Sequence, residues 1–266
     1  MNCRFQILGS SSSGNCAFLQ TADAKILIDA GFSGRRTAEM LEEIGERPDD
    51  LDAIFLTHEH SDHINGLRGL SRFKNLKIFA NHYTAEAARR GLRRNPEWGL
   101  FESGTTFTFR DLEISSFSIP HDSSDPVGFV FQFGGQDLFN PVHRIGWVLD
   151  LGYATNLVKE RIAKVDTLVI EANHDHQLLR LDQKRPWQVK QRIGGRQGHL
   201  SNEACCETLT EIQPHSSWKK VILGHLSGDC NNLECIRKAF SPFIGSATVP
   251  FAFQVVDGEG NLHELR

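Results

Sequence analysis

Three histidines and one aspartate crowd into the segment FLTHEHSDHINGL, which covers residues 55–67. They directly follow the hydrophobic stretch DAIFLT and are His58, His60, Asp62 and His63. Imidazole and carboxylate groups together suit zinc, iron or manganese. A loop after a strand would let His58 and His60 converge on one point while Asp62 and His63 turn to a neighbouring one. We therefore predict a metal site, against the alternative of a polar loop whose histidines only cap and hydrogen-bond.

A pair of metal ions about 3.5–4 Å apart would clamp a nucleophilic oxygen between them. Four side chains cannot complete two metal shells, so further ligands must come from elsewhere in the chain. The motif THEHSDH resembles the defining motif of the metallo-β-lactamase superfamily. This resemblance implies an αββα fold with the metals at the edge between two sheets. It also implies later ligands in loops that follow strands.

The resemblance points to three later residues: His121 in IPHDSSDP, Asp150 in WVLDLG and His225 in LGHLSG. Each of them alone could be an ordinary loop or turn residue. The implied cofactors are two divalent ions, zinc or manganese. The implied ligands form two sets bridged by Asp150, with His58, His60 and His121 for one metal and Asp62, His63 and His225 for the other.

Three acidic and basic residues outside this set have implied supporting roles. Asp29 in ILIDAG would orient the histidine loop, or would simply form a turn beside a glycine. Glu171 in IEANHD and His199 in RQGHLSN resemble the pair of the phosphodiesterase branch typified by ribonuclease Z. An imidazolium held by a carboxylate can stabilise charge on phosphorus or donate a proton to the leaving oxygen. Asp62, Glu171 and His199 are the predicted catalytic residues, although both members of the pair could instead be structural.

Further motifs extend the resemblance over nearly the whole chain and narrow it to the bacterial YycJ/WalJ-type hydrolases. That group is associated with DNA exonuclease activity and DNA repair, which the resemblance implies. One departure is the segment 134–147, which is longer than the hairpin expected before Asp150. His143 and Arg144 in that segment could lie near the site or on a surface hairpin. The motifs are LGSSSSGNC, ILIDAGFS, DAIFLTHEHSDHINGL, IPHDSSDPVGF, DLGYAT, IEANHD, GHLSN and ILGHLSGDCNN.

Two segments are candidates for contacts with a phosphate backbone. Residues 184–198 carry no acidic residue and lead directly to His199. Their cations could track phosphates while Trp187 stacks on a base, or the segment could be a solvated charged loop. In GSSSSGN, Ser12 and Asn15 could offer donors to phosphate, or the segment could be a tight turn between strands. The predicted cationic contacts are Lys190, Arg192 and Arg196.

Strands must end beside these residues if they are to meet. Short runs rich in β-branched and aromatic residues predict strands in both halves, among them KILIDA, DAIFLT, LEISSFSI, VGFVFQF, GWVLDL, DTLVIEA and KKVILGH. Apolar spacing predicts helices at 35–44, 64–73, 155–163, 201–212 and 233–240. Ser201 or Asn202 would cap the fourth. We predict one α/β domain over residues 1–266, with two mixed sheets packed face to face and helices outside. Composition does not exclude a single doubly wound sheet.

Bulk properties limit the function classes. The formal net charge is −4, so a nucleic acid would have to be held by a local basic surface. No signal peptide or membrane-spanning run is apparent, and the six cysteines form no C-x-x-C pair. We therefore expect a cytoplasmic protein with reduced thiols and no membrane partner.

The predicted function is two-metal hydrolysis of a phosphodiester, with DNA attacked from an end as the favoured substrate and repair proteins as further partners. A small-molecule or cyclic-nucleotide phosphodiesterase is the enzymatic alternative. A metal-bound scaffold that binds DNA or repair proteins without turnover is the alternative of a different class. RNA as substrate stays open.

Overall fold

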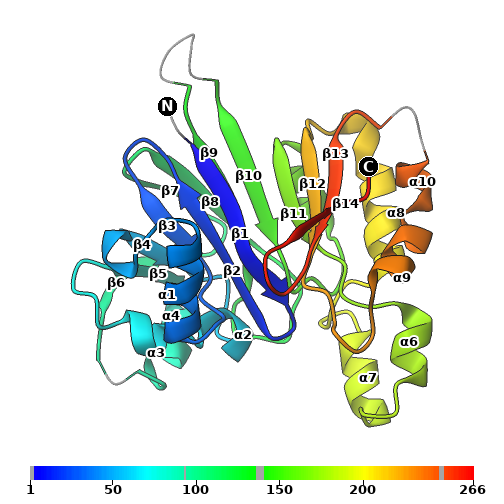
Figure 1. Cartoon of the computed structure of the whole chain (residues 1–266), viewed down its shortest axis with the longest axis horizontal. Helices are drawn as coiled ribbons and strands as arrows, with labels where there is room; N and C mark the ends of the chain where they lie inside the picture. Colours follow the sequence, from blue (N-terminus) through cyan, green and yellow to red (C-terminus); the bar gives the residue numbers. More distant parts are fainter. Residues whose placement is uncertain (1–2, 93, 136–140, 246–248) are drawn as a thin grey trace.

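The strand-forming segments of the two halves build two separate sheets (Figure 1). The computed structural model describes residues 3–92, 94–135, 141–245 and 249–266. The first sheet has the strand order β1-β2-β3-β4-β5-β6. Neighbouring strands from β3 to β6 are parallel, whereas β2 is antiparallel to both β1 and β3. These strands are β1 Arg4–Ser11, β2 Gly14–Gln20, β3 Lys25–Ile28, β4 Ala53–Phe55, β5 Lys77–Asn81 and β6 Glu97–Phe101.

The second sheet has the order β14-β13-β12-β11-β10-β9-β8-β7. Neighbouring strands from β10 to β13 are parallel, and the other pairs are antiparallel. Because β8 is separated from β10 by one antiparallel strand, β8 also runs in the direction of β10. The strands are β7 Thr106–Phe109, β8 Leu112–Ser118, β9 Val127–Phe133, β10 His143–Val148, β11 Thr167–Glu171, β12 Lys220–Gly224, β13 Ala252–Val256 and β14 Leu262–Glu264.

Helices cover the outer face of each sheet (Figure 1). The first sheet carries α1 Gly34–Glu43, α2 Ser61–Ile64, α3 Leu67–Leu70 and α4 His82–Arg89. The connections of the second sheet contain α5 Asn156–Ala163, α6 His176–Leu181, α7 Trp187–Ile193, α8 Asn202–Ile212, α9 Leu233–Ala239 and α10 Ser241–Ile244. Two short 3₁₀ turns, Pro48–Asp50 and Gln213–His215, complete the elements. Within the part of the chain that the structure describes, no helix is long and apolar enough to cross a membrane.

The buried side chains separate into layers that follow this arrangement. One cluster fills the space between the sheets and joins Ile26 and Phe55 of the first sheet to Phe129 and Trp147 of the second. Two other clusters lie between each sheet and its outer helices. The layers are therefore helix, sheet, sheet and helix. This confirms the predicted αββα sandwich and excludes a single doubly wound sheet, whereas the single domain over residues 1–266 stays a prediction.

The predicted helix over residues 64–73 is wrong in its bounds. Helix α2 already begins at Ser61, so Asp62 and His63 lie on a helical turn rather than in a loop. The helix is then interrupted at Gly66, whose N–H donates to the carbonyl of Ala30 at 2.7 Å. A Cβ at Gly66 would come within 2.9 Å of that carbonyl oxygen. The N–H of Gly66 thus bonds to Ala30 instead of continuing α2, and α3 begins at the next residue.

In two further segments the sequence left the conformation open. Helix α7 occupies half of the segment 184–198, which could have been an open loop. In the segment 134–147, residues 136–140 lie outside the described part. His143 and Arg144 begin β10 and face β9, where His143 stacks on Phe133. Asp150 follows the other end of β10, roughly 20 Å away at about 3.3 Å per residue. Both residues therefore belong to a hairpin remote from Asp150.

Candidate metal centre

The predicted ligands converge at one edge of the sandwich because the strands that precede them run in the same direction. His58 follows β4, His121 follows β8, Asp150 follows β10 and His225 follows β12. The carboxyl ends of strands are where α/β folds form their sites. In this fold both sheets contribute, since β4 belongs to the first sheet and the other three strands to the second.

One group of possible ligands consists of His58, His60 and His121. Each offers a ring nitrogen, and these nitrogens lie within 4.8 Å of one another. The Nε2 atom of His121 is 3.1 Å from Nδ1 of His60. On its other side the His121 ring is held by a contact of 3.0 Å between Nδ1 and the carbonyl of Gly198. Three imidazoles at these distances match the ligand type and number of a metal site with open positions.

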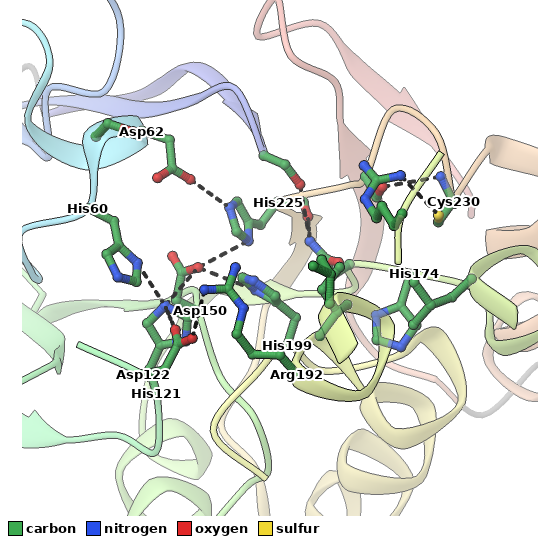
Figure 2. Close-up of a pocket in the computed structure, with 18 residues that line it drawn as sticks. His60, Asp62, His121, Asp122, Asp150, His174, Arg192, His199, His225 and Cys230 are labelled. Carbon is green, nitrogen blue, oxygen red and sulfur yellow. Dashed lines mark hydrogen bonds and ion pairs between the residues drawn. The ribbon is translucent and has the colours of Figure 1, made fainter. Parts of the chain in front are cut away.

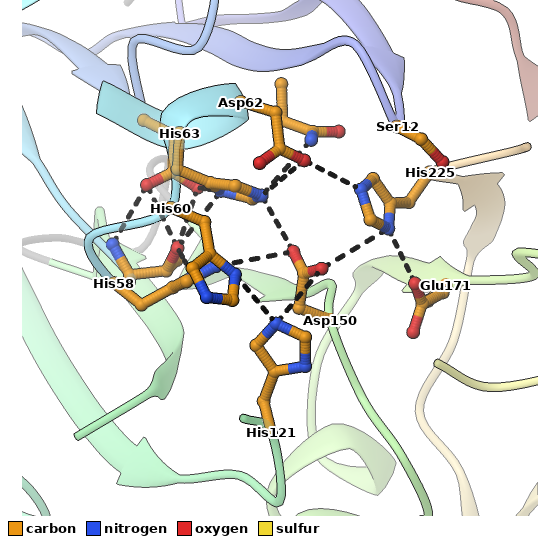
Figure 3. A network of polar contacts seen from close by, with 12 residues as sticks. Ser12, His58, His60, Asp62, His63, His121, Asp150, Glu171 and His225 are labelled. Atoms are coloured by element: carbon orange, nitrogen blue, oxygen red, sulfur yellow. Dashed lines mark hydrogen bonds and ion pairs between the residues drawn. The ribbon is translucent and has the colours of Figure 1, made fainter. Parts of the chain in front are cut away.

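A second group consists of Asp62, His63, Asp150 and His225, with ligand atoms within the same mutual distance. His63 Nε2 is 2.7 Å from Asp150 Oδ2, and His225 Nε2 is 3.3 Å from Asp62 Oδ2. Asp150 also lies 3.6 Å from Nε2 of His121 in the first group. Figure 3 shows its carboxylate between the two groups. Asp150 is thus placed where one carboxylate can reach both.

The donor set of this cluster fits a divalent cation. His58 Nε2 and Asp150 Oδ2 are buried and make no hydrogen bond, although His63 Nε2 is close to the latter. A buried polar atom without a partner costs roughly 1–3 kcal/mol. Mixed imidazole and carboxylate donors suit zinc, manganese or iron. A cation that accepts lone pairs from both atoms would remove this cost.

The protonation of the histidines divides them into two kinds. Burial and the neighbouring His63 hold the pKa of His58 well below its usual value, and burial lowers the pKa of His121. Burial would also lower the pKa of His63 and His225, but Asp150 and other carboxylates outweigh it. The pKa of His63 is raised well above its usual value, and that of His225 is raised to about 10. Metal ligation needs neutral imidazole. His58 and His121 are therefore ready to bind, whereas His63 and His225 must first lose a proton.

Asp29 holds the histidine segment in place from the end of β3. Its carboxylate accepts from the backbone N–H of Thr57 at 2.9 Å and from the indole of Trp147 at 3.2 Å. Its second oxygen lies 2.8 Å from Nδ1 of His63. The contact fixes which ring nitrogen of His63 faces Asp150. Asp29 thus contacts His63 of the cluster directly and reaches His58 through Thr57.

Replacing Asp29 by alanine is expected to lower the free energy of unfolding by about 3 kcal/mol, because buried donors on Thr57, His63 and Trp147 lose their acceptor. Alanine is also disfavoured at the positive φ of 58° found there. Asp29→Asn keeps one acceptor and tolerates that φ, so its loss should be smaller. Urea denaturation with chelator present measures both variants against the exposed Asp49→Ala. A change below about 1 kcal/mol in Asp29→Ala would contradict this role.

Backbone strain is concentrated at the same edge. Among the described non-glycine residues, those with positive φ are Asp29, Asp150, His225 and Arg110, at 58°, 56°, 56° and 54°. The first three lie in or beside the cluster. Such conformations cost energy and persist where the surroundings fix them, often at functional sites. Each of these three residues comes just after a strand, and its left-handed conformation changes the direction of the chain there.

Glu171 and His199 form the predicted pair. Glu171 is fully buried at the end of β11, and its Oε1 lies 2.8 Å from Nδ1 of His199. Burial would raise the pKa of Glu171, but His199 and His225 lower it to about 2. Burial would lower the pKa of His199, but Glu171 outweighs it and raises that pKa. The raised pKa favours the protonated ring of His199, whose Nδ1 lies 3.3 Å from Oδ1 of Asp150.

The contact of Glu171 with His225 was missing from the sequence prediction. The same Oε1 atom meets Nδ1 of His225, while Oε2 accepts from the backbone N–H groups of Leu151 and Leu200 at 2.7 and 3.0 Å. Glu171 thus joins the loops that follow β10 and β12 to the segment between α7 and α8. No sequence spacing indicates this, because the partners are separated by 20, 29 and 54 positions.

A cavity of about 360 Å³ opens over the cluster (Figure 2). His60, Asp62, His121, Asp150, His199 and His225 line it together with Ser12 and Arg192. Sequence reasoning missed Asp122, which also lines the cavity and lies 3.3 Å from Arg192. It also assigned no firm role to His174, a buried lining residue whose two ring nitrogens have no hydrogen-bond partner. Burial lowers the pKa of His174 to about 4, so its ring is neutral.

The other predicted substrate residues lie outside the lining of this cavity. Asn15 is buried behind the cluster, where its amide contacts Nε2 of His63 at 3.2 Å and the carbonyl of Ser11 at 3.1 Å. Lys190 donates to the carbonyl of Arg180 and lines a separate hollow with Trp187. Arg196 lines a groove next to the cavity. Of the predicted substrate residues, Ser12 and Arg192 are the two that reach the cluster's cavity.

The fold and this edge cluster together define the class of protein. The sequence matches the family described as "Beta-lactamase superfamily domain" over residues 24–225. The structure is similar to the metallo-β-lactamase fold protein YhfI from Bacillus subtilis, with a TM-score of 0.71, 16% identity and 98% of each chain covered. The chain belongs to the metallo-β-lactamase superfamily of hydrolases.

Within the superfamily, the chain is similar to two curated bacterial proteins over most of their length. It is 38% identical to the exodeoxyribonuclease WalJ of Streptococcus pneumoniae, covering 86% of this chain and 83% of the relative. It is 33% identical to the exodeoxyribonuclease YycJ of Bacillus anthracis, covering 91% and 89%. The predicted membership of this superfamily and the resemblance to this group are confirmed.

Proposed function

We propose that this protein is a divalent-metal-dependent exodeoxyribonuclease. The observation that carries the proposal is the position of His199. Its ring is held by the buried carboxylate of Glu171, which raises its pKa, and it lines the cavity that opens over two groups of metal-type ligands. A cation cluster beside a proton donor is the arrangement that phosphodiester hydrolysis needs. The similarity to relatives named as exodeoxyribonucleases supports DNA as the substrate.

We propose two divalent ions, zinc or manganese, as the cofactors. Bound ions of this kind lower the pKa of water toward neutrality and offset negative charge on phosphate. The distances within each group support the division that the sequence suggested. One ion would be held by His58, His60 and His121, the other by Asp62, His63 and His225, with Asp150 reaching both.

The protein's own residues have separable roles in this proposal. The imidazolium of His199 donates its proton to the departing oxygen of the scissile diester. Glu171 is a positioning residue, because it keeps Nδ1 of His199 occupied and leaves the other nitrogen facing the cavity. Arg192 and Ser12, at the cavity wall, bind non-reacting oxygens of the phosphate.

The test is digestion of end-labelled single- and double-stranded DNA together with metal analysis of the purified protein. We expect nucleotides to be released from an end, the release to stop with chelator, and zinc or manganese to restore it. Asp62→Ala should retain DNA affinity and lose hydrolysis. Cleavage of short diesters with no gain from DNA length would instead support a small-molecule phosphodiesterase. DNA binding without any cleavage by the metal-loaded protein would support a scaffold.

We further propose that the protein acts in the cytoplasm, in DNA repair, and with repair proteins as partners. The resemblance to the YycJ/WalJ group implies the repair role. All six cysteines are free thiols, as expected in a reducing compartment.

A further inference from the structure

A groove lies directly beside the cavity of the metal cluster. We call it the side groove and define it by Pro120, Asp122, Tyr153, Arg192, Gly195, Arg196 and Gln197. Asp122 and Arg192 line both the side groove and the cavity, so the two hollows adjoin each other at this pair. Figure 2 shows Arg192 reaching toward Asp122 on the side of the cavity that carries His121. A ligand that leaves the cluster past this pair enters the side groove.

The side groove contains a cationic stacking platform. The guanidinium carbon of Arg196 lies 4.3 Å from the centre of the Tyr153 ring. Gly152 permits this contact, because a Cβ at that position would come 2.2 Å from the carbonyl oxygen of Arg196. A planar guanidinium on an aromatic ring presents an exposed flat face that can accept a base and a charge that can accept a phosphate. Within the described residues Arg196 has no carboxylate within salt-bridge distance, so its charge is available.

The first cations of the same basic segment, by contrast, are held in ion pairs. Lys184 and Arg185 begin the basic segment 184–198, but Asp229 pairs with both of them. Arg185 also pairs with Asp182 at 3.0 Å. These carboxylates neutralise the cations that a phosphate would need. Among the described residues Arg196 has no such partner, and this difference favours the side groove as the path of an anionic chain.

We infer that the side groove binds the single strand of nucleic acid that continues from the scissile phosphate, with Arg192 and Arg196 on successive phosphates and an unpaired base stacked on the Tyr153–Arg196 platform. This inference rests on the proposed function and specifies its substrate. The strand is single because bases in a duplex are already stacked on one another and cannot reach a protein platform. Asp122 is the partner that a phosphate displaces from Arg192.

The inference predicts how activity depends on substrate length. In the wild-type protein, kcat/KM should rise as a single-stranded oligonucleotide is lengthened from two nucleotides to about six, the range bound by small single-strand sites. In Arg196→Ala and Tyr153→Ala the rise should be lost, with kcat/KM on the longer oligonucleotide about tenfold lower. Bis(p-nitrophenyl) phosphate, which does not extend into the groove, should be hydrolysed within about twofold of wild type. The matched control is Lys184→Ala, which removes one exposed, ion-paired cation from the same segment.

Binding gives a second readout that needs no turnover. The affinity for a labelled single-stranded oligonucleotide, measured with chelator present, should fall in Arg196→Ala, and its dependence on salt should lose about one unit of slope. A length dependence and a salt slope that match wild type would overturn the inference. An equal loss on bis(p-nitrophenyl) phosphate would also overturn it, because the residue would then act on the cluster. Failure of the wild-type protein to cleave any diester would refute the proposed function. The binding measurement would still test whether the side groove binds a single strand.

Discussion

Asp150→Asn is expected to reduce nuclease activity by about 10²–10³-fold, the size of effect seen when one preorganised electrostatic group is removed from a site. The carboxylate lies 2.7 Å from His63, 3.6 Å from His121 and 3.3 Å from His199. It therefore contacts both ligand groups and the proposed acid. Asparagine removes its charge but tolerates the positive φ of 56°. The loss of activity should therefore come from the missing negative charge and not from a disrupted turn.

Metal content and activity measured together test this prediction. The purified variant should hold fewer divalent ions per chain than the wild-type protein, with chelator-treated samples of both unfolding at similar temperatures. The matched control is Asp166→Asn. Asp166 directly precedes β11, at the end of that strand opposite Glu171, and its carboxylate accepts from the N–H of Arg144. A variant that keeps full metal content and loses less than about tenfold in activity would show that Asp150 does not join the two groups.

The residues nearest in sequence were the most predictable part of the site. His58, His60, Asp62 and His63 lie within one strand end and one helical turn, so their spacing alone brings them together. His121, Asp150 and His225 were inferred from resemblance, and no spacing could place them. These three residues lie together because β8, β10 and β12 run in the same direction. The alternation of polar and apolar residues along a strand does not encode that direction. The sequence pattern gives the strands, whereas register and direction arise from packing of the two sheets.

The parts that were not predicted share a different cause. The break between α2 and α3 arises where Gly66 meets the carbonyl of Ala30, and the platform in the side groove exists because Gly152 lets the chain near Arg196 approach. Both are contacts between backbones distant in sequence. A glycine in a sequence does not tell which backbone will lie against it. The Arg192–Asp122 ion pair also went unpredicted, because it joins side chains 70 positions apart and Arg192 was predicted only as a phosphate contact.

Glu171 and His199 are expected to act as one unit, and a double-mutant cycle measures this. His199→Ala should reduce kcat by about 10²–10⁴-fold, the usual contribution of a general acid. Glu171→Gln should cost about 10–100-fold, because glutamine keeps an acceptor for the N–H groups of Leu151 and Leu200 but loses the charge that holds His199. If Glu171 acts mainly through His199, the double variant should resemble His199→Ala alone. Fully additive losses would instead mean that the contact of Glu171 with His225 dominates.

The pH dependence of kcat distinguishes a loss of the effect of Glu171 on His199 from general structural damage. The active form in this proposal is the protonated His199, whose pKa is raised by Glu171 despite its burial. Activity should therefore be present below that pKa and fall as the pH rises through it. Without the charge of Glu171 the pKa of His199 drops, so the basic limb of kcat in Glu171→Gln should move to lower pH. Glu203→Gln, on the exposed part of α8, should leave the limb in place. A basic limb that is unchanged in Glu171→Gln and persists in His199→Ala would assign it to another group, and His199 would no longer be the acid.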